Sequence, residues 1–199
     1  MSAPRATEII FLPGFDGVAE LRAPFVAALA ERHPARAIGY PNRRLETLAG
    51  YARFASGQVA PESRPILVAE SFSGLVAARW AASDPHVAGL VLCGAFARSP
   101  VPWASLGADV LAERLAIISA EDVSEELRRI EAPIVLVQFD DDLVIGAAAR
   151  LHLESVCARA TVVRFAGPHF AIEVRPRESA AAVELAVASL FEAPRRASA

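Results

Sequence analysis

The segment around Ser71 restricts the possible folds of this chain more than any other. The run Ile66-Leu67-Val68-Ala69 is short, apolar and rich in branched side chains, which is typical of a buried strand. Residues 72–83 then have the composition of a helix that ends at Ser83-Asp84-Pro85. A buried strand that passes straight into a helix indicates a layered α/β protein, with Ser71 in the connecting turn.

Ser71 has small residues on both sides, as a sharp strand-to-helix turn requires. Ala69 and Ser73 stand where the nucleophile-elbow motif G-x-S-x-G has glycines. An elbow exposes its hydroxyl at the carboxyl edge of a sheet, so Ser71 is the candidate nucleophile, with an ordinary helix cap as its alternative role. Ser73 is a rival, but it falls in the first helical turn, and Leu75 two residues later is not small.

Strand and helix patterns alternate along the 199 residues, and several prolines fall between them. This alternation predicts a three-layer α/β/α sandwich with a parallel sheet of about six strands, in the order 2-1-3-4-5-6 if the crossovers are right-handed. We expect a single domain over residues 1–193 and a disordered tail over 194–199. The predicted strands are 8–12, 36–40, 65–70, 87–94, 132–139 and 160–165. The predicted helices are 20–32, 45–56, 72–83, 105–116, 145–157 and 176–192.

Two later strand ends carry the residue types that assist a serine nucleophile. Asp140-Asp141-Asp142 follow strand 132–139, and His169 follows strand 160–165 after a Gly-Pro loop that can turn an imidazole toward the elbow. Adjacent carboxylates are also typical of a solvated turn that caps a helix, so the pattern leaves the choice of acid open. The other histidines suit solvated or capping positions: His33, His86 and His152.

The first predicted strand ends in the glycine-rich turn Pro13-Gly14-Phe15-Asp16-Gly17. Such a turn can bring a backbone N–H to the place where a tetrahedral oxyanion forms. Asp16 is expected to order the turn through an Asx-type hydrogen bond. Glu70, next to Ser71, must either reach solvent or pair with an arginine, and the sequence leaves both open.

With these motifs the chain resembles the α/β-hydrolase superfamily over nearly its whole length. Leu12-Pro13-Gly14-Phe15-Asp16-Gly17, Glu70-Ser71-Phe72-Ser73-Gly74 and Gly167-Pro168-His169-Phe170 are similar to those of small, lidless bacterial serine hydrolases of the esterase or thioesterase kind. The resemblance implies Ser71 as nucleophile, His169 as base and Asp142 as orienting acid. Asp141, in the same acidic run, is the alternative acid. The resemblance also implies Phe15 and Phe72 as the residues whose N–H groups form the oxyanion hole.

The activity that this resemblance implies is cleavage of a carboxylic ester or thioester through an acyl-enzyme, with a small molecule as substrate. Two alternatives stay open: acyl transfer by the same triad, and a catalytically idle hydrolase fold used for binding. The chain has no room for the N-terminal hairpin of a full-size hydrolase, and residues 96–131 leave little for a lid. We therefore expect an open groove framed by Phe15, Phe72, Phe170 and Trp103, although Trp103 is as well suited to packing its own loop.

Composition excludes several classes of function. All 20 basic residues are arginine, which excludes a Schiff-base lysine and the lysine of a phosphate-binding P-loop. A net charge of −3 gives no case for binding nucleic acid or an anionic membrane. Histidine and cysteine are too scattered for a zinc site, so we expect no metal or cofactor.

Cysteine usage and hydropathy indicate a cytoplasmic protein. Cys93 and Cys157 do not make a disulfide framework and are expected to be buried free thiols. We find no signal-like segment and no apolar run long enough to span a bilayer. The sequence leaves the oligomeric state open.

Overall fold

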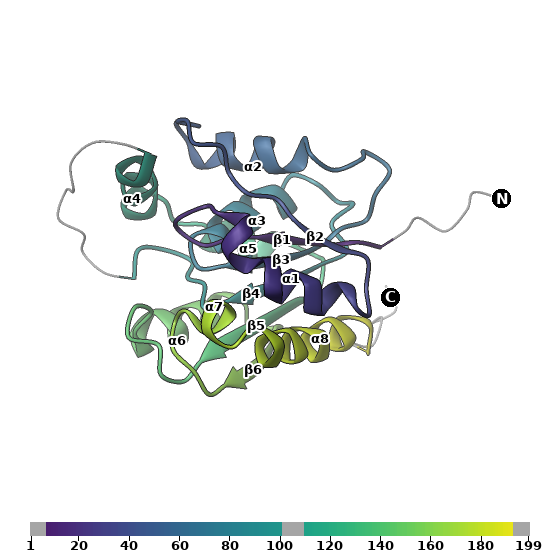
Figure 1. The fold of residues 1–199 in the computed structure, drawn as a ribbon. Coiled ribbons are helices and arrows are strands. Elements are labelled where there is room, and N and C mark those ends of the chain that lie inside the picture. Colours follow the sequence, from purple (N-terminus) through teal and green to yellow (C-terminus); the bar gives the residue numbers. More distant parts are fainter. Residues whose placement is uncertain (1–6, 101–109, 193–199) are drawn as a thin grey trace, which may run out of the picture.

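The structure, a computed structural model, describes residues 7–100 and 110–192. Its centre is a six-stranded, wholly parallel sheet in the order β2-β1-β3-β4-β5-β6, so the predicted strand order is confirmed (Figure 1). Trp103 and the predicted tail over 194–199 lie outside the described residues. The strands are β1 (Ile9–Leu12), β2 (Ala35–Ala37), β3 (Ile66–Glu70), β4 (Gly89–Cys93), β5 (Ile134–Phe139) and β6 (Thr161–Phe165).

Helices cover both faces of the sheet, which gives the predicted three-layer sandwich. Successive residues of a central strand point to opposite layers. Leu67 and Ala69 therefore pack in one buried cluster, while Ile66 and Val68 pack in the other. The first cluster is completed by α2 (Leu48–Ser56), α3 (Ser73–Ala81), α4 (Val110–Ala120), α5 (Ser124–Arg129) and α6 (Ala147–Val156). The second is completed by α1 (Ala23–Ala30), α7 (Ala171–Val174) and α8 (Pro176–Glu192).

Some elements differ from the sequence-based expectation. The predicted helix 20–32 is divided into a 3₁₀ turn, η1 (Ala19–Arg22), and α1, because Pro24 fits the first turn of a new helix, where no N–H partner is needed. The predicted strand 36–40 is shorter, since Tyr40 N–H donates to the Gly17 carbonyl and the chain leaves the sheet there. Two helices, α5 and α7, were not predicted, because six and four residues are too short to show helical periodicity.

The parallel register brings the ends of the central strands to one edge of the sheet. Leu12 is paired with Ala69, and Glu70 with Cys93. Phe139 is paired with Phe165 at the ends of β5 and β6. The loops that follow β1, β3, β5 and β6 consequently start side by side, which is where open α/β sheets bind ligands. No helix in the described ranges is long and apolar enough to cross a membrane.

Candidate active site

Ser71 occupies a sharp turn between β3 and α3. Its φ angle of +50° lies in the left-handed region, which non-glycine residues rarely adopt. The Ser71 N–H donates to the Cys93 carbonyl over 2.9 Å, which continues the pairing of β3 with β4 into the turn. Gly74 lets α3 approach closely, because a Cβ there would lie 2.6 Å from the Cβ of Ala95. The sequence thus builds the elbow with a single strained residue at its tip.

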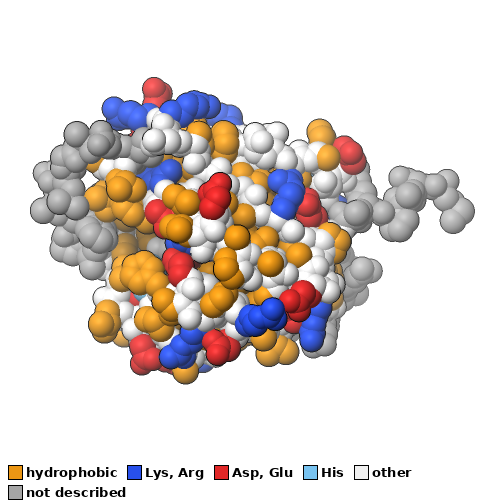
Figure 2. Space-filling view, viewed as in Figure 1, with side chains coloured by type: hydrophobic (Ala, Val, Ile, Leu, Met, Phe, Trp, Pro, Cys, Tyr) orange, Lys and Arg blue, Asp and Glu red, His pale blue; other side chains and the backbone are white. Residues whose placement is uncertain are grey.

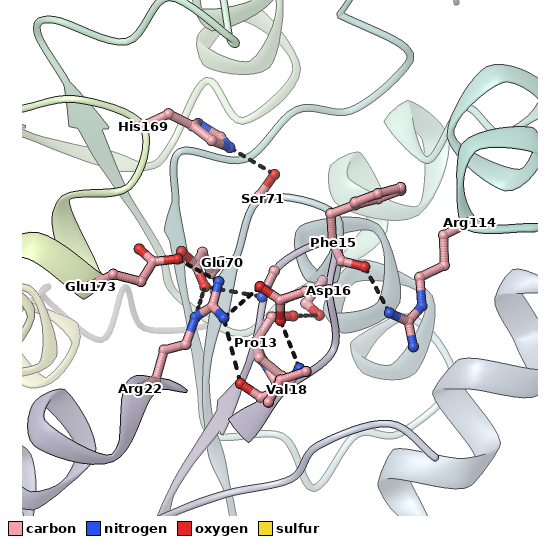
Figure 3. Close-up of polar contacts among 12 residues, drawn as sticks. Pro13, Phe15, Asp16, Val18, Arg22, Glu70, Ser71, Arg114, His169 and Glu173 are labelled. Carbon is pink, nitrogen blue, oxygen red and sulfur yellow. Dashed lines mark hydrogen bonds and ion pairs between the residues drawn. The ribbon is translucent and has the colours of Figure 1, made fainter. Parts of the chain in front are cut away.

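His169 connects Ser71 to a carboxylate. Its Nε2 atom lies 3.0 Å from Ser71 Oγ, and its Nδ1 atom lies 2.8 Å from Asp142 Oδ2 (Figure 3 shows the first contact). The other oxygen of Asp142 accepts the N–H groups of Val144 and Ile145, at 2.9 and 2.7 Å. Ser71, His169 and Asp142 are each more than 90% buried, so water competes weakly for these hydrogen bonds.

The alternative candidates lie elsewhere. Asp140 and Asp141 are exposed and make no contact with the His169 ring, so only Asp142 of the three acids faces it. Ser73 is fully buried, and its hydroxyl lies 2.5 Å from both the Pro13 carbonyl and the Tyr40 hydroxyl. His86 contacts Asp84, and His152 contacts Ser124. The hydroxyl of Ser73 is thus occupied by contacts under the elbow.

The two phenylalanines expected at the oxyanion hole have different surroundings. The ring of Phe72 has no exposed surface and packs edge-on against Tyr51, with ring centres 5.3 Å apart. It belongs to the core, which corrects the expectation that this ring frames the groove. Phe15 is partly buried. In the described part of the chain, the backbone N–H groups of Phe15 and Phe72 donate no hydrogen bond.

Phe170 is the exposed aromatic residue beside the triad. Its ring is 55% exposed, and its centre lies 5.2 Å from that of the His169 imidazole. Leu143, next to Asp142, and Val174 in α7 are also exposed. Hydrophobic side chains gather on the lower left of the face shown in Figure 2, over the region of α6 and α7. The surface close to the triad therefore offers apolar contacts.

Glu70 pairs with an arginine, one of the two outcomes that the sequence left open. Its Oε2 atom accepts hydrogen bonds from Arg22 Nε and from the Gly14 N–H, both at 3.0 Å (Figure 3). Burial and the nearby Glu173 carboxylate raise the pKa of Glu70 to about 7, against the opposite effects of Arg22 and the Gly14 N–H. Asp16 accepts the Val18 N–H over 2.7 Å, which is the expected Asx-type turn.

Arg114 of α4 is a second buried arginine that supports the loop after β1. Its Nη1 donates to the Phe15 carbonyl over 2.7 Å, and its guanidinium lies 5.4 and 5.5 Å from the ring centres of Tyr40 and Tyr51. Gly17, with φ of +73°, makes room for it, because a Cβ there would lie 2.6 Å from Arg114 Nη2. Sequence reasoning missed Arg22 and Arg114, and no local pattern distinguishes them from the other arginines.

The described residues contain no group of three or more potential metal ligands of the His, Cys, Asp or Glu type. Both cysteines are buried and free. Burial raises the pKa of the Cys157 thiol to about 11, and the pKa of Cys93 rises as well. Neither thiol has the lowered pKa of a reactive cysteine.

No protein-family model matches the chain, and no curated protein matches its sequence. Many solved structures match its fold. A lipase-esterase related protein from Clostridium acetobutylicum is 13% identical, with a TM-score of 0.78 over 92% of this chain and 95% of that one. An enol-lactonase from Burkholderia xenovorans is 17% identical, with a TM-score of 0.76 over 93% and 92%. An esterase from Rhodococcus sp. is 19% identical, with a TM-score of 0.73 over 93% and 91%. The chain therefore has the α/β-hydrolase fold.

Proposed function

We propose that this protein is a serine hydrolase that cleaves carboxylic esters or thioesters of small molecules. The observation that carries the proposal is the hydrogen-bonded chain Ser71–His169–Asp142 on a strained elbow. Structures of the same fold include an esterase and an enol-lactonase, which supports this reaction class. The buried free thiols favour a reducing compartment, so we also propose a cytoplasmic location.

In the first half of the reaction, Ser71 Oγ attacks the carbonyl carbon while His169 Nε2 takes its proton. Asp142 holds the Nδ1–H of His169 and stabilises the imidazolium that forms. The negative charge moves to the carbonyl oxygen, which accepts the N–H groups of Phe15 and Phe72. When the tetrahedral intermediate collapses, the carbon–oxygen or carbon–sulfur bond breaks, and His169 returns the proton to the leaving alcohol or thiol.

In the second half, water takes the place of the leaving group. His169 removes a proton from the water as its oxygen attacks the acyl-enzyme, and the same N–H groups bind the new oxyanion. Collapse returns the proton to Ser71 and releases the carboxylic acid. Every step uses groups of the chain and water, so the mechanism needs no cofactor.

The proposal that the substrate has an uncharged acyl chain rests on the exposed apolar side chains near His169 and Asp142. Phe170, Leu143 and Val174 are exposed there, so an uncharged acyl chain gains contact area on binding. Phe15 is partly buried and carries one of the two N–H groups of the proposed oxyanion hole. Acyl transfer to an alcohol remains the second reaction that this triad can perform if water is excluded.

The decisive experiment is labelling of the purified protein with a fluorophosphonate probe, followed by mass mapping of the modified residue. Modification of Ser71 supports the enzyme, whereas a protein that is never labelled is an idle hydrolase fold. Ester and thioester hydrolysis in the presence of an added alcohol then separates the two reactions. Release of free acid alone indicates hydrolysis, and a new ester indicates transfer.

A further inference from the structure

The guanidinium of Arg22 lies where three segments of the candidate active site meet. Its Nε donates to Glu70 over 3.0 Å, its Nη1 to Asp16 over 2.6 Å, and its Nη2 to Glu173 over 2.5 Å. In Figure 3 the three carboxylates surround this guanidinium. Glu70 directly precedes Ser71, Asp16 directly follows Phe15, and Glu173 lies in α7, which follows His169. One side chain therefore contacts the elbow, the loop after β1 and the helix after the histidine.

The central pair of this network is removed from water. The side chains of Arg22 and Glu70 are each 2% exposed. A buried ion pair contributes little net stability, because the loss of hydration offsets the attraction between the charges. The planar guanidinium instead supplies geometry, since its N–H groups point in fixed directions. The network is thus suited to holding loops in register.

Phe15 is held on both sides by the same pair. The Gly14 N–H, just before it, donates to Glu70 Oε2, and Asp16, just after it, accepts from Arg22. The turn is closed by the Gly17 N–H, which donates to the Gly14 carbonyl over 3.1 Å. Glu70 directly precedes Ser71 in the chain. The Arg22–Glu70 pair therefore fixes the position of the Phe15 N–H relative to Ser71.

We propose that Arg22 is a positioning residue that aligns the oxyanion-hole N–H of Phe15 with Ser71 through Glu70 and Asp16. Its contact with Glu173 joins the segment after His169 to the same centre. The inference rests on the proposed function, because alignment matters only if Ser71 forms an oxyanion intermediate. Arg22 acts through other residues and touches no reacting atom.

The main test is Arg22→Lys, which keeps the positive charge but replaces three directed donors by a single ammonium group. Loss of a complete oxyanion-hole donor costs about 10²–10³-fold in kcat, so a misaligned one should cost about 10–100-fold. KM for p-nitrophenyl butyrate should change little. Arg36→Lys is the matched control, because Arg36 of β2 makes its ion pair with Glu8 away from the triad.

Fluorophosphonate labelling separates positioning from a merely structural role. A misaligned oxyanion hole lowers the labelling rate constant while every molecule is eventually labelled. A folding defect instead lowers the labelled fraction and leaves the rate constant of the intact molecules unchanged. We expect the first result for Arg22→Lys, with circular dichroism and melting close to those of the wild type.

Asp16→Asn provides a second variant that does not endanger the fold, because Asp16 is partly exposed. Asp16→Asn removes one charged contact of Arg22. It should therefore lower the labelling rate constant and kcat, but by a smaller factor than Arg22→Lys does. Wild-type rate constants in Asp16→Asn and in folded Arg22→Lys would overturn the positioning role. A wild-type protein that neither labels nor hydrolyses esters would overturn the proposed function itself.

Discussion

The Nε2 atom of His169 lies 3.0 Å from Ser71 Oγ, although 98 positions separate the two residues in the chain. The contact exists because β3 and β6 are parallel strands of one sheet, whose following loops begin at the same edge. The positive φ of Ser71 turns its side chain out of the strand toward the imidazole. This relationship defines the first prediction.

Ser71→Ala should abolish fluorophosphonate labelling and lower kcat for ester hydrolysis by several orders of magnitude, because no other hydroxyl in residues 7–100 and 110–192 hydrogen-bonds to His169. Ser73→Ala is the control. The Ser73 hydroxyl is hydrogen-bonded to the Pro13 carbonyl and the Tyr40 hydroxyl. Ser73→Ala should therefore lower the free energy of unfolding by about 1 kcal/mol and still be labelled by the probe. An acyl-enzyme detected by mass spectrometry in Ser71→Ala would exclude Ser71 as the nucleophile.

Asp142→Asn should reduce kcat by about 10³–10⁴-fold, because an amide at this position favours the wrong tautomer of His169 and does not stabilise the imidazolium. Steady-state kinetics of p-nitrophenyl ester hydrolysis provide the measurement. Asp141→Asn is the matched control, since this side chain is exposed and should be nearly silent. Equal losses in the two variants would contradict the assignment of Asp142.

Glu70→Gln should change how stability depends on pH. The pKa of Glu70 is raised from 4.5 to about 7 in the folded protein, chiefly by burial and by Glu173, while Arg22 and the Gly14 N–H oppose the rise. Between these pH values the folded state holds a proton that the unfolded state has released, so stability falls as pH rises through this window. The glutamine variant lacks this titration and should gain stability relative to wild type from pH 4.5 to 7.

Urea unfolding of both proteins across this pH range measures the effect as a difference in the free energy of unfolding. The difference removes the contributions of titrating groups that do not interact with Glu70, and it retains the coupling of Glu70 to Glu173 and Cys93. Glu31→Gln is the control, because Glu31 is exposed in a surface ion pair with Arg177. A difference that stays constant with pH would show that Glu70 is ionised throughout.

Acyl-chain preference should level off after a few carbons. Each buried methylene contributes about 0.8 kcal/mol, so kcat/KM rises severalfold per carbon only while the chain finds apolar surface. Phe170 and Val174 are both exposed, so we expect the acyl chain to meet an open surface that a short chain already covers. The measurement is kcat/KM for p-nitrophenyl esters from about two to about sixteen acyl carbons. A steady rise to the longest chain would instead reveal a deep acyl tunnel.

Local sequence patterns suffice to predict the layered fold, and they place Ser71 and His169 just after two of its strands. Apolar runs such as Ile66-Leu67-Val68-Ala69 mark buried strands, and right-handed crossovers leave few ways to order them, so the strand order followed from local patterns. Ser71 and His169 could be placed because each directly follows a strand, and parallel strands end at one edge. Ser71 and His169 therefore come together because of the sheet topology, which the alternating strand and helix patterns of the sequence predict.

The side chains that support these groups are selected by packing between distant parts of the chain. Asp142 differs from Asp140 and Asp141 in the direction of its side chain, a property that three identical neighbours do not reveal in sequence. Arg22 contacts Glu70, 48 positions away, and Arg114 contacts Phe15, 99 positions away. Arginine side chains are long and flexible, so the neighbouring sequence does not show which group the guanidinium will contact. The ring of Phe72 turned into the core because Tyr51 and Tyr40 form an aromatic cluster there, and that packing exists only once the helices and the sheet have come together.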